Sequence, residues 1–91
     1  MVGAQLIAAG RSEAAVQSLT TAVTKFRAAK KSEYTLMAEG YIGIARTLVN
    51  STRDAGKKDL QSAVDALLEN GSPDAKFFAG QLRTAAKVFS K

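Results

Sequence analysis

Apolar residues recur at spacings of three and four along most of the chain, and this periodicity limits the fold more than any other feature. Such spacing places apolar side chains on one face of an α-helix. A single proline in 91 residues leaves these stretches uninterrupted. The pattern predicts helices over residues 12–29, 33–50, 54–69 and 73–90. We therefore expect an all-α fold of four main helices, in one domain spanning residues 1–91.

The predicted boundaries coincide with residues that begin or end helices. Ser12 and Ser32 are the expected N-caps of the first two helices. Gly71 is expected to end the third helix in a left-handed conformation, after which Ser72 is an N-cap and Pro73 takes the first helical position. Because these connections are short, neighbouring helices should pack antiparallel. The result is a bundle, or a short array of hairpins pairing the first helix with the second and the third with the fourth.

Glycines inside the helical patterns give a second indication of packing. Gly40 and Gly43 each cost about 1 kcal/mol relative to alanine in a helix interior. A helix accepts that cost where another helix approaches closely, so the second helix is expected to be central. Gly10 is expected to separate a short helix over residues 4–9, and Gly56 offers a break near the start of the third helix. The expected core is Val16, Leu19, Val23, Phe26, Met37, Tyr41, Ile44, Leu48, Leu60, Val64, Leu67, Phe78, Leu82 and Phe89.

The sequence contains few of the residue types that enzymes use for catalysis. The chain has no histidine and no cysteine, which excludes imidazole and thiolate chemistry. It has no phosphate-binding glycine loop, and the acids of the third helix are expected to face solvent. The sequence thus predicts a protein that is not an enzyme and uses no metal or cofactor. No apolar stretch reaches the roughly 20 residues of a membrane span and the N-terminus lacks signal-peptide features, so we expect a cytoplasmic protein.

The formal charge of +5 is distributed unevenly. Residues 1–31 contain five basic residues and one acid, residues 71–91 contain four and one, and the middle is mildly acidic. Basic clusters can neutralise phosphates, so nucleic-acid binding is the alternative function. The candidate anion-binding residues are Lys25, Arg27, Lys30, Lys31, Lys76, Arg83 and Lys87.

Apolar residues beside the main stripes favour a different function. Ile42, Val49, Phe77 and Val88 form extra apolar edges, and Phe77 is the expected exposed anchor. Helices with more than one apolar face need more partners than a small bundle supplies. The sequence therefore predicts a non-catalytic protein–protein interaction module, such as an adaptor, regulatory or assembly subunit. It would bind another protein or itself through these helix faces.

Residues 9–29 resemble the second helix of a tetratricopeptide repeat. In that pattern a glycine opens the turn, a small residue and an aliphatic one start the helix, and a large residue and an alanine follow. Here these roles fall to Gly10, Ala15, Val16, Leu19 and Ala22. The resemblance extends to residue 70 through Ala38, Gly40, Tyr41, Ala45, Gly56, Ala63 and Leu67. It implies a right-handed array of helical hairpins whose inner groove binds a peptide or partner protein, with the fourth helix as a solvating cap.

Overall fold

The computed structural model describes residues 10–89, apart from the side chains of Asn50 and Phe89. It contains α2 (Ser12–Ala28), α3 (Ser32–Thr47), the short 3-10 helix η1 (Asn50–Thr52), α4 (Arg53–Asn70) and α5 (Pro73–Phe89). No strand occurs within residues 10–89, and the predicted all-α class with four main helices is confirmed. The helix expected over residues 4–9 lies outside the described residues. None of the described helices is long and apolar enough to cross a membrane.

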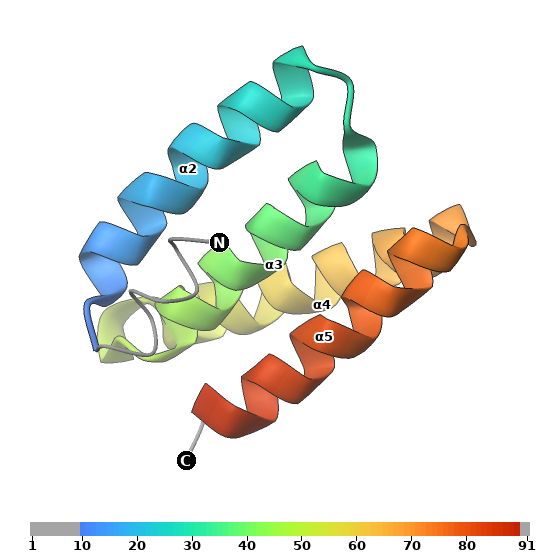
Figure 1. The fold of residues 1–91 in the computed structure, drawn as a ribbon. Coiled ribbons are helices and arrows are strands. Elements are labelled where there is room, and N and C mark those ends of the chain that lie inside the picture. Colours follow the sequence, from blue (N-terminus) through green and yellow to red (C-terminus); the bar gives the residue numbers. More distant parts are fainter. Residues whose placement is uncertain (1–9, 90–91) are drawn as a thin grey trace.

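Successive helices run in opposite directions, and α3 lies among the other three (Figure 1). It packs against α2, α4 and α5, and its most extensive interface is with α4. The prediction that this helix is central is therefore confirmed. The predicted hairpins correspond to α2 with α3 and α4 with α5. Both pairs are in contact, but the largest interface, between α3 and α4, was not among the predicted pairs.

Gly43 of α3 and Gly56 of α4 lie against each other where these helices cross. A Cβ atom on Gly43 would lie 2.8 Å from the Gly56 carbonyl oxygen and 2.7 Å from the Leu60 backbone nitrogen. A Cβ on Gly56 would lie 2.6 Å from the Gly43 carbonyl oxygen. Gly40 in turn lies against the Leu82 side chain of α5. Close packing at Gly40 and Gly43 is confirmed, whereas Gly56 is not a break but a buried position inside α4.

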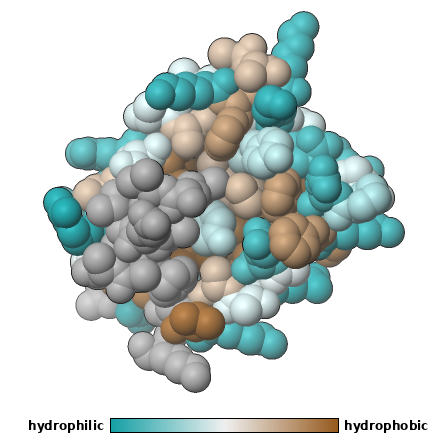
Figure 2. Space-filling model, in the orientation of Figure 1, coloured by the Kyte–Doolittle hydropathy of each residue, from teal (hydrophilic) through white to brown (hydrophobic). Residues whose placement is uncertain are grey.

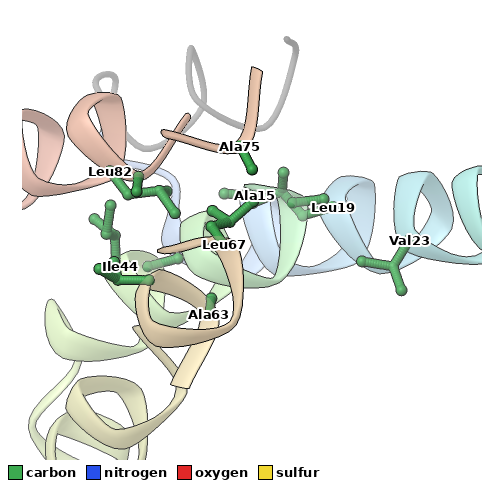
Figure 3. Close-up of a cluster of buried hydrophobic side chains, with 12 residues drawn as sticks. Ala15, Leu19, Val23, Ile44, Ala63, Leu67, Ala75 and Leu82 are labelled. Carbon is green, nitrogen blue, oxygen red and sulfur yellow. The ribbon is translucent and has the colours of Figure 1, made fainter. Parts of the chain in front are cut away.

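The core gathers side chains from all four helices (Figure 3). Its largest fully buried members are Leu19, Ile44, Leu67 and Leu82, one from each helix and all predicted. Half of the buried apolar residues are alanines, and none of these was predicted for the core. They are Ala15, Ala38, Ala45, Ala63, Ala75 and Ala79. These small side chains let the helix backbones approach closely.

The other predicted core residues have mixed outcomes. Val23 and Val64 are buried, Met37 is half-buried, and five more pack partly buried against the core: Val16, Phe26, Tyr41, Leu60 and Phe78. The prediction that Leu48 belongs to the core is wrong, because its side chain remains 36% exposed. Leu48 follows the last residue of α3, so its side chain no longer continues the buried stripe. The side chain of Phe89 lies outside the described residues.

The C-terminus of α3 lies earlier in the sequence than predicted. α3 stops at Thr47, three residues before the predicted end. Thr52 Oγ1 donates to the Arg46 carbonyl oxygen at 2.8 Å, and Arg53 Nε donates to the Thr47 carbonyl oxygen at 3.4 Å. These side chains satisfy carbonyl groups that a helix leaves free at its C-terminus. The chain can therefore leave α3 there and turn into η1.

The helix caps divide between confirmed and wrong predictions. Gly71 has φ +75° and ends α4, and the Ala75 backbone N–H donates to Ser72 Oγ at 3.1 Å at the start of α5. Both were predicted. Ser12 and Ser32 are not caps, because each is the first residue of its helix and Arg11 and Lys31 take the N-cap positions without a side-chain cap bond.

Candidate interaction surface

One side of α5 faces away from the core and carries large apolar side chains. Ala75, Ala79 and Leu82 face inward and are fully buried. Phe77 and Val88 lie on the opposite side of the same helix, 61% and 60% exposed. A helix that packs on one side only would carry polar residues on the other. α5 is therefore apolar on two sides, as its sequence predicts.

A groove of about 630 Å³ runs along this outer side of α5. Phe77 and Val88 lie near its two ends, and Tyr41 of α3 lines it as well. The remaining lining residues are Lys76, Gly80, Gln81, Thr84 and Ala85. Figure 2 shows hydrophobic and hydrophilic surface side by side over the region where α5 lies. The groove is thus an apolar surface with a polar rim.

Gly80 has no packing explanation within the described residues. A Cβ atom there would meet no other atom within 4 Å, unlike those on Gly40, Gly43 and Gly56. Glycine in a helix interior costs about 1 kcal/mol relative to alanine. Gly80 lines the α5 groove, and no other described element fills the space beside it.

A basic stripe lies beside the groove. Lys76, Arg83 and Lys87 follow one another at helical spacing on α5, one flank over from the row that includes Phe77 and Val88. The acid of α5 within the described residues is Asp74, in the first turn. The flank along most of α5 is therefore positively charged.

Tyr41 forms part of the groove from the side of α3. Its side chain is partly buried against the core, and burial raises the pKa of its hydroxyl above the ordinary value of 10.0. The cause is desolvation, which disfavours the phenolate. Tyr41 thus brings a partly buried aromatic ring to the edge of the groove.

A row of aromatic rings joins three helices at one end of the molecule. Ring centroids lie 5.5 Å apart for Phe26 and Tyr34, 5.3 Å for Tyr34 and Phe78, and 6.0 Å for Phe78 and Phe77. Lys31 Nζ lies 5.9 Å from the centroid of the Tyr34 ring, within range of a cation–π contact. The row connects the turn between α2 and α3 with the start of α5.

The first basic cluster lies at that turn. Lys25 and Arg27 are in the last turn of α2, and Lys30 and Lys31 follow it, with Lys30 in a left-handed conformation of φ 58°. Arg27 Nη2 pairs with Glu39 Oε1 of α3 at 2.9 Å, so part of the cluster's charge is offset. The remaining basic side chains of the turn are exposed. The aromatic row brings this cluster to the end of the molecule where Lys76 also lies.

Ile42 and Val49 do not join the α5 groove. Ile42 lines a second groove of about 480 Å³ between α2, α3 and α4, across which Arg46 Nη1 pairs with Asp59 Oδ2 at 2.6 Å. Val49 lies after the end of α3, next to the start of α2. The four predicted apolar edge residues are therefore split among three places, and only Phe77 and Val88 share one.

Sequence reasoning missed Gly80, Gln81 and Thr84 as members of the site. The signal was present, because Phe77, Gln81, Thr84 and Val88 follow a helical spacing of four, three and four.

Within the described residues there is no group of three or more side chains of the kinds that bind metals. Searches among protein-family models, curated proteins and solved structures find no match to this chain.

Proposed function

We propose that this chain is a non-catalytic, cytoplasmic protein–protein interaction module, a small adaptor, regulatory or assembly subunit that binds its partner through α5. The observation that carries the proposal is the exposure of Phe77 and Val88 at the two ends of one groove. Apolar surface rimmed by polar residues is typical of protein interaction sites.

The size of the apolar side chains supports this function. Fully burying a phenylalanine or valine side chain contributes about 1.5–3 kcal/mol. Binding energy at protein interfaces concentrates in a few large side chains that fill pockets near the centre. Phe77 is the most exposed large apolar residue described, which makes it the expected anchor.

A tetratricopeptide-like arrangement remains part of the proposal. Successive antiparallel helices and the close crossing of α3 and α4 at Gly43 and Gly56 support it. The role of α5 is the point of difference. A terminal capping helix carries a polar outer face, whereas the outer face of α5 includes Phe77 and Val88. We therefore assign partner binding to α5 instead of a capping role.

The test is site-specific photocrosslinking in the cells that express the protein. A photoreactive phenylalanine derivative replaces Phe77 in one variant and the exposed Gln61 of α4 in the control. We expect a discrete protein adduct from position 77 and none of that size from position 61. Adding Val88→Glu to the first variant should abolish the adduct, while circular dichroism shows an unchanged fold. Equal adducts at both positions, or none at position 77, would contradict the proposal.

Nucleic-acid binding is the second candidate. The observation that favours it is the pair of exposed rings, Tyr34 and Phe77, beside Lys31 and Lys76. Aromatic rings next to basic side chains are typical of single-strand binding. Retention on immobilised single-stranded RNA at two salt concentrations tests it, with Tyr34→Ala as the informative variant. No retention at low salt removes this candidate, and retention unaffected by Tyr34→Ala indicates attraction by net charge alone.

A further inference from the structure

We infer that the α5 groove receives an acidic amphipathic helix from a partner protein, an inference that rests on the interaction function proposed above. Two features of α5 lie side by side and together specify this occupant. One is the apolar groove between Phe77 and Val88, and the other is the basic stripe of Lys76, Arg83 and Lys87.

The dimensions of the groove fit a helix. Phe77 and Val88 are eleven positions apart on α5, which corresponds to about 16 Å, or roughly three helical turns. A helix packs into such a groove through side chains at positions i, i+4 and i+7. Gly80 and Thr84 lie between the two apolar ends, and among the described residues no other part of the fold lies within 4 Å of a Cβ on Gly80. A side chain of the incoming helix therefore has room at Gly80.

The charge of the rim sets the chemistry of the occupant. Lys76 lines the groove itself, and Arg83 lies on the same flank two turns further along α5. Acidic side chains along one edge of the incoming helix would meet these residues at the rim. Such pairs favour the correct partner and speed its approach.

A second copy of the chain is a poorer occupant. In a symmetric antiparallel pair of α5 helices each flank lies beside the same flank of the other copy. The basic stripe would then face itself, and like charges in this arrangement destabilise the pair. The acid of α5, Asp74, comes two residues before Lys76, and at about 100° per residue it lies on a different side of the helix from the basic stripe. The surface is thus suited to a different chain.

A nucleic acid is also a poorer occupant of the groove. Phosphates could pair with the basic stripe, and a base could stack on Phe77. Val88 is equally exposed at the other end of the groove and has no aromatic face on which a base could stack. Gly80 provides depth that a flat base has no use for, whereas an aliphatic side chain fills it.

The test uses three synthetic helical peptides of about 15 residues. All carry the same leucine and alanine face, and their flanking positions are all Glu, all Gln or all Lys. Fluorescence anisotropy measures their binding to the full chain. We expect the Glu peptide to bind about tenfold more tightly than the Gln peptide, and the Lys peptide to bind most weakly. The preference should shrink as salt is added, because the pairs at the rim are exposed.

Charge-reversed variants of the chain complete the test. Arg83→Glu should remove the preference for the Glu peptide, whereas Lys58→Glu, an exposed change on α4, should leave it intact. Val88→Ser should weaken all three peptides. Equal binding of the Glu and Lys peptides, no binding of any peptide, or displacement of the Glu peptide by a single-stranded oligonucleotide would each overturn the inference. If position 77 gives a protein adduct but the chain shows no preference for the Glu peptide, only this inference is overturned. If position 77 gives no adduct, the proposed function itself is overturned.

Discussion

At the residue scale, Gly43, Gly56 and Gly80 occupy helix interiors for different reasons. Gly43 and Gly56 bring two helix backbones into contact, and neither has room for a methyl group. Gly80 has room on every side within the described residues and still gives up helix propensity. Glycine therefore marks a contact between helices at Gly43 and Gly56, and an outward-facing position at Gly80.

Gly43→Ala should destabilise the fold. The added Cβ would meet the backbone of Gly56 and Leu60, which cannot move aside as a side-chain tip can. We expect a loss of about 1–3 kcal/mol in the free energy of unfolding, even after the gain in helix propensity. Urea unfolding followed by circular dichroism measures it.

Gly80→Ala is the matched control. Because a Cβ at Gly80 meets no other element in the described part of the chain, this change should raise the free energy of unfolding by up to about 1 kcal/mol. If both substitutions shift stability in the same direction, the packing explanation for Gly43 does not hold.

Tyr41 should keep its proton to higher pH in the folded protein than in the unfolded chain. Its folded pKa is raised, so its contribution to stability is fully present below pH 10 and is lost as the pH rises through the folded pKa. The chain has two tyrosines, and Tyr34→Phe leaves Tyr41 as the single chromophore. Phenolate absorbance against pH should show a higher midpoint in native protein than in urea. Coinciding midpoints in protein that circular dichroism shows to be folded would refute this.

At the scale of the helices, local signals were most informative where a side chain bonds to the backbone near its own position. The boundary between α4 and α5 is predictable because Gly71, Ser72 and Pro73 each act within a few residues. The N-caps of α2 and α3 were predicted one residue too late, at Ser12 and Ser32, whereas Arg11 and Lys31 hold these positions. Serine alone does not make an N-cap, because the backbone conformation before the helix decides which residue takes that position.

Ser72→Ala should therefore destabilise the protein by about 1 kcal/mol, through loss of the bond from the Ala75 N–H. Ser12→Ala and Ser32→Ala should change stability by less than about 0.5 kcal/mol, since neither N-cap position holds a serine. Urea unfolding of the three variants under identical conditions makes the comparison. A loss at Ser12 as large as that at Ser72 would count against the observed caps.

At the scale of the whole molecule, α3 organises the fold. It contacts α2, α4 and α5, and it contributes Gly40, Gly43 and Ile44 to the interior. The aromatic row also passes through it, since Tyr34 touches rings from both α2 and α5. The turn after α2 and the start of α5, more than 40 residues apart in sequence, thus lie at one end of the molecule.

The backbone amides of α3 should be the slowest to exchange with deuterium. An amide in a helix covered by three neighbours opens only when the whole fold opens, whereas α5 has an exposed side. Hydrogen exchange followed by mass spectrometry or NMR measures this at pH 7. Exchange in the middle of α3 that is as fast as exchange in α5 would show that α3 is not the stable centre.

Much of the fold was predictable from the sequence, and the site less so. The large core residues Leu19, Ile44, Leu67 and Leu82 and the exposed Phe77 follow from helical periodicity alone. The buried alanines do not, because alanine is equally at home on a helix surface. Ile42 and Phe77 looked alike as apolar edge residues, yet they line different grooves on different helices.

Sequence by itself determined the all-α class, the number of main helices and the turn from α4 into α5. These depend on hydrogen bonds and side-chain spacing within a few residues of each other. Only the tertiary structure decided that Gly56 meets Gly43, that Tyr41 of α3 lines a groove on α5, and that Gly80 packs against no other described element. Those relations depend on which helix faces meet, and that choice is made by packing between residues far apart in the chain.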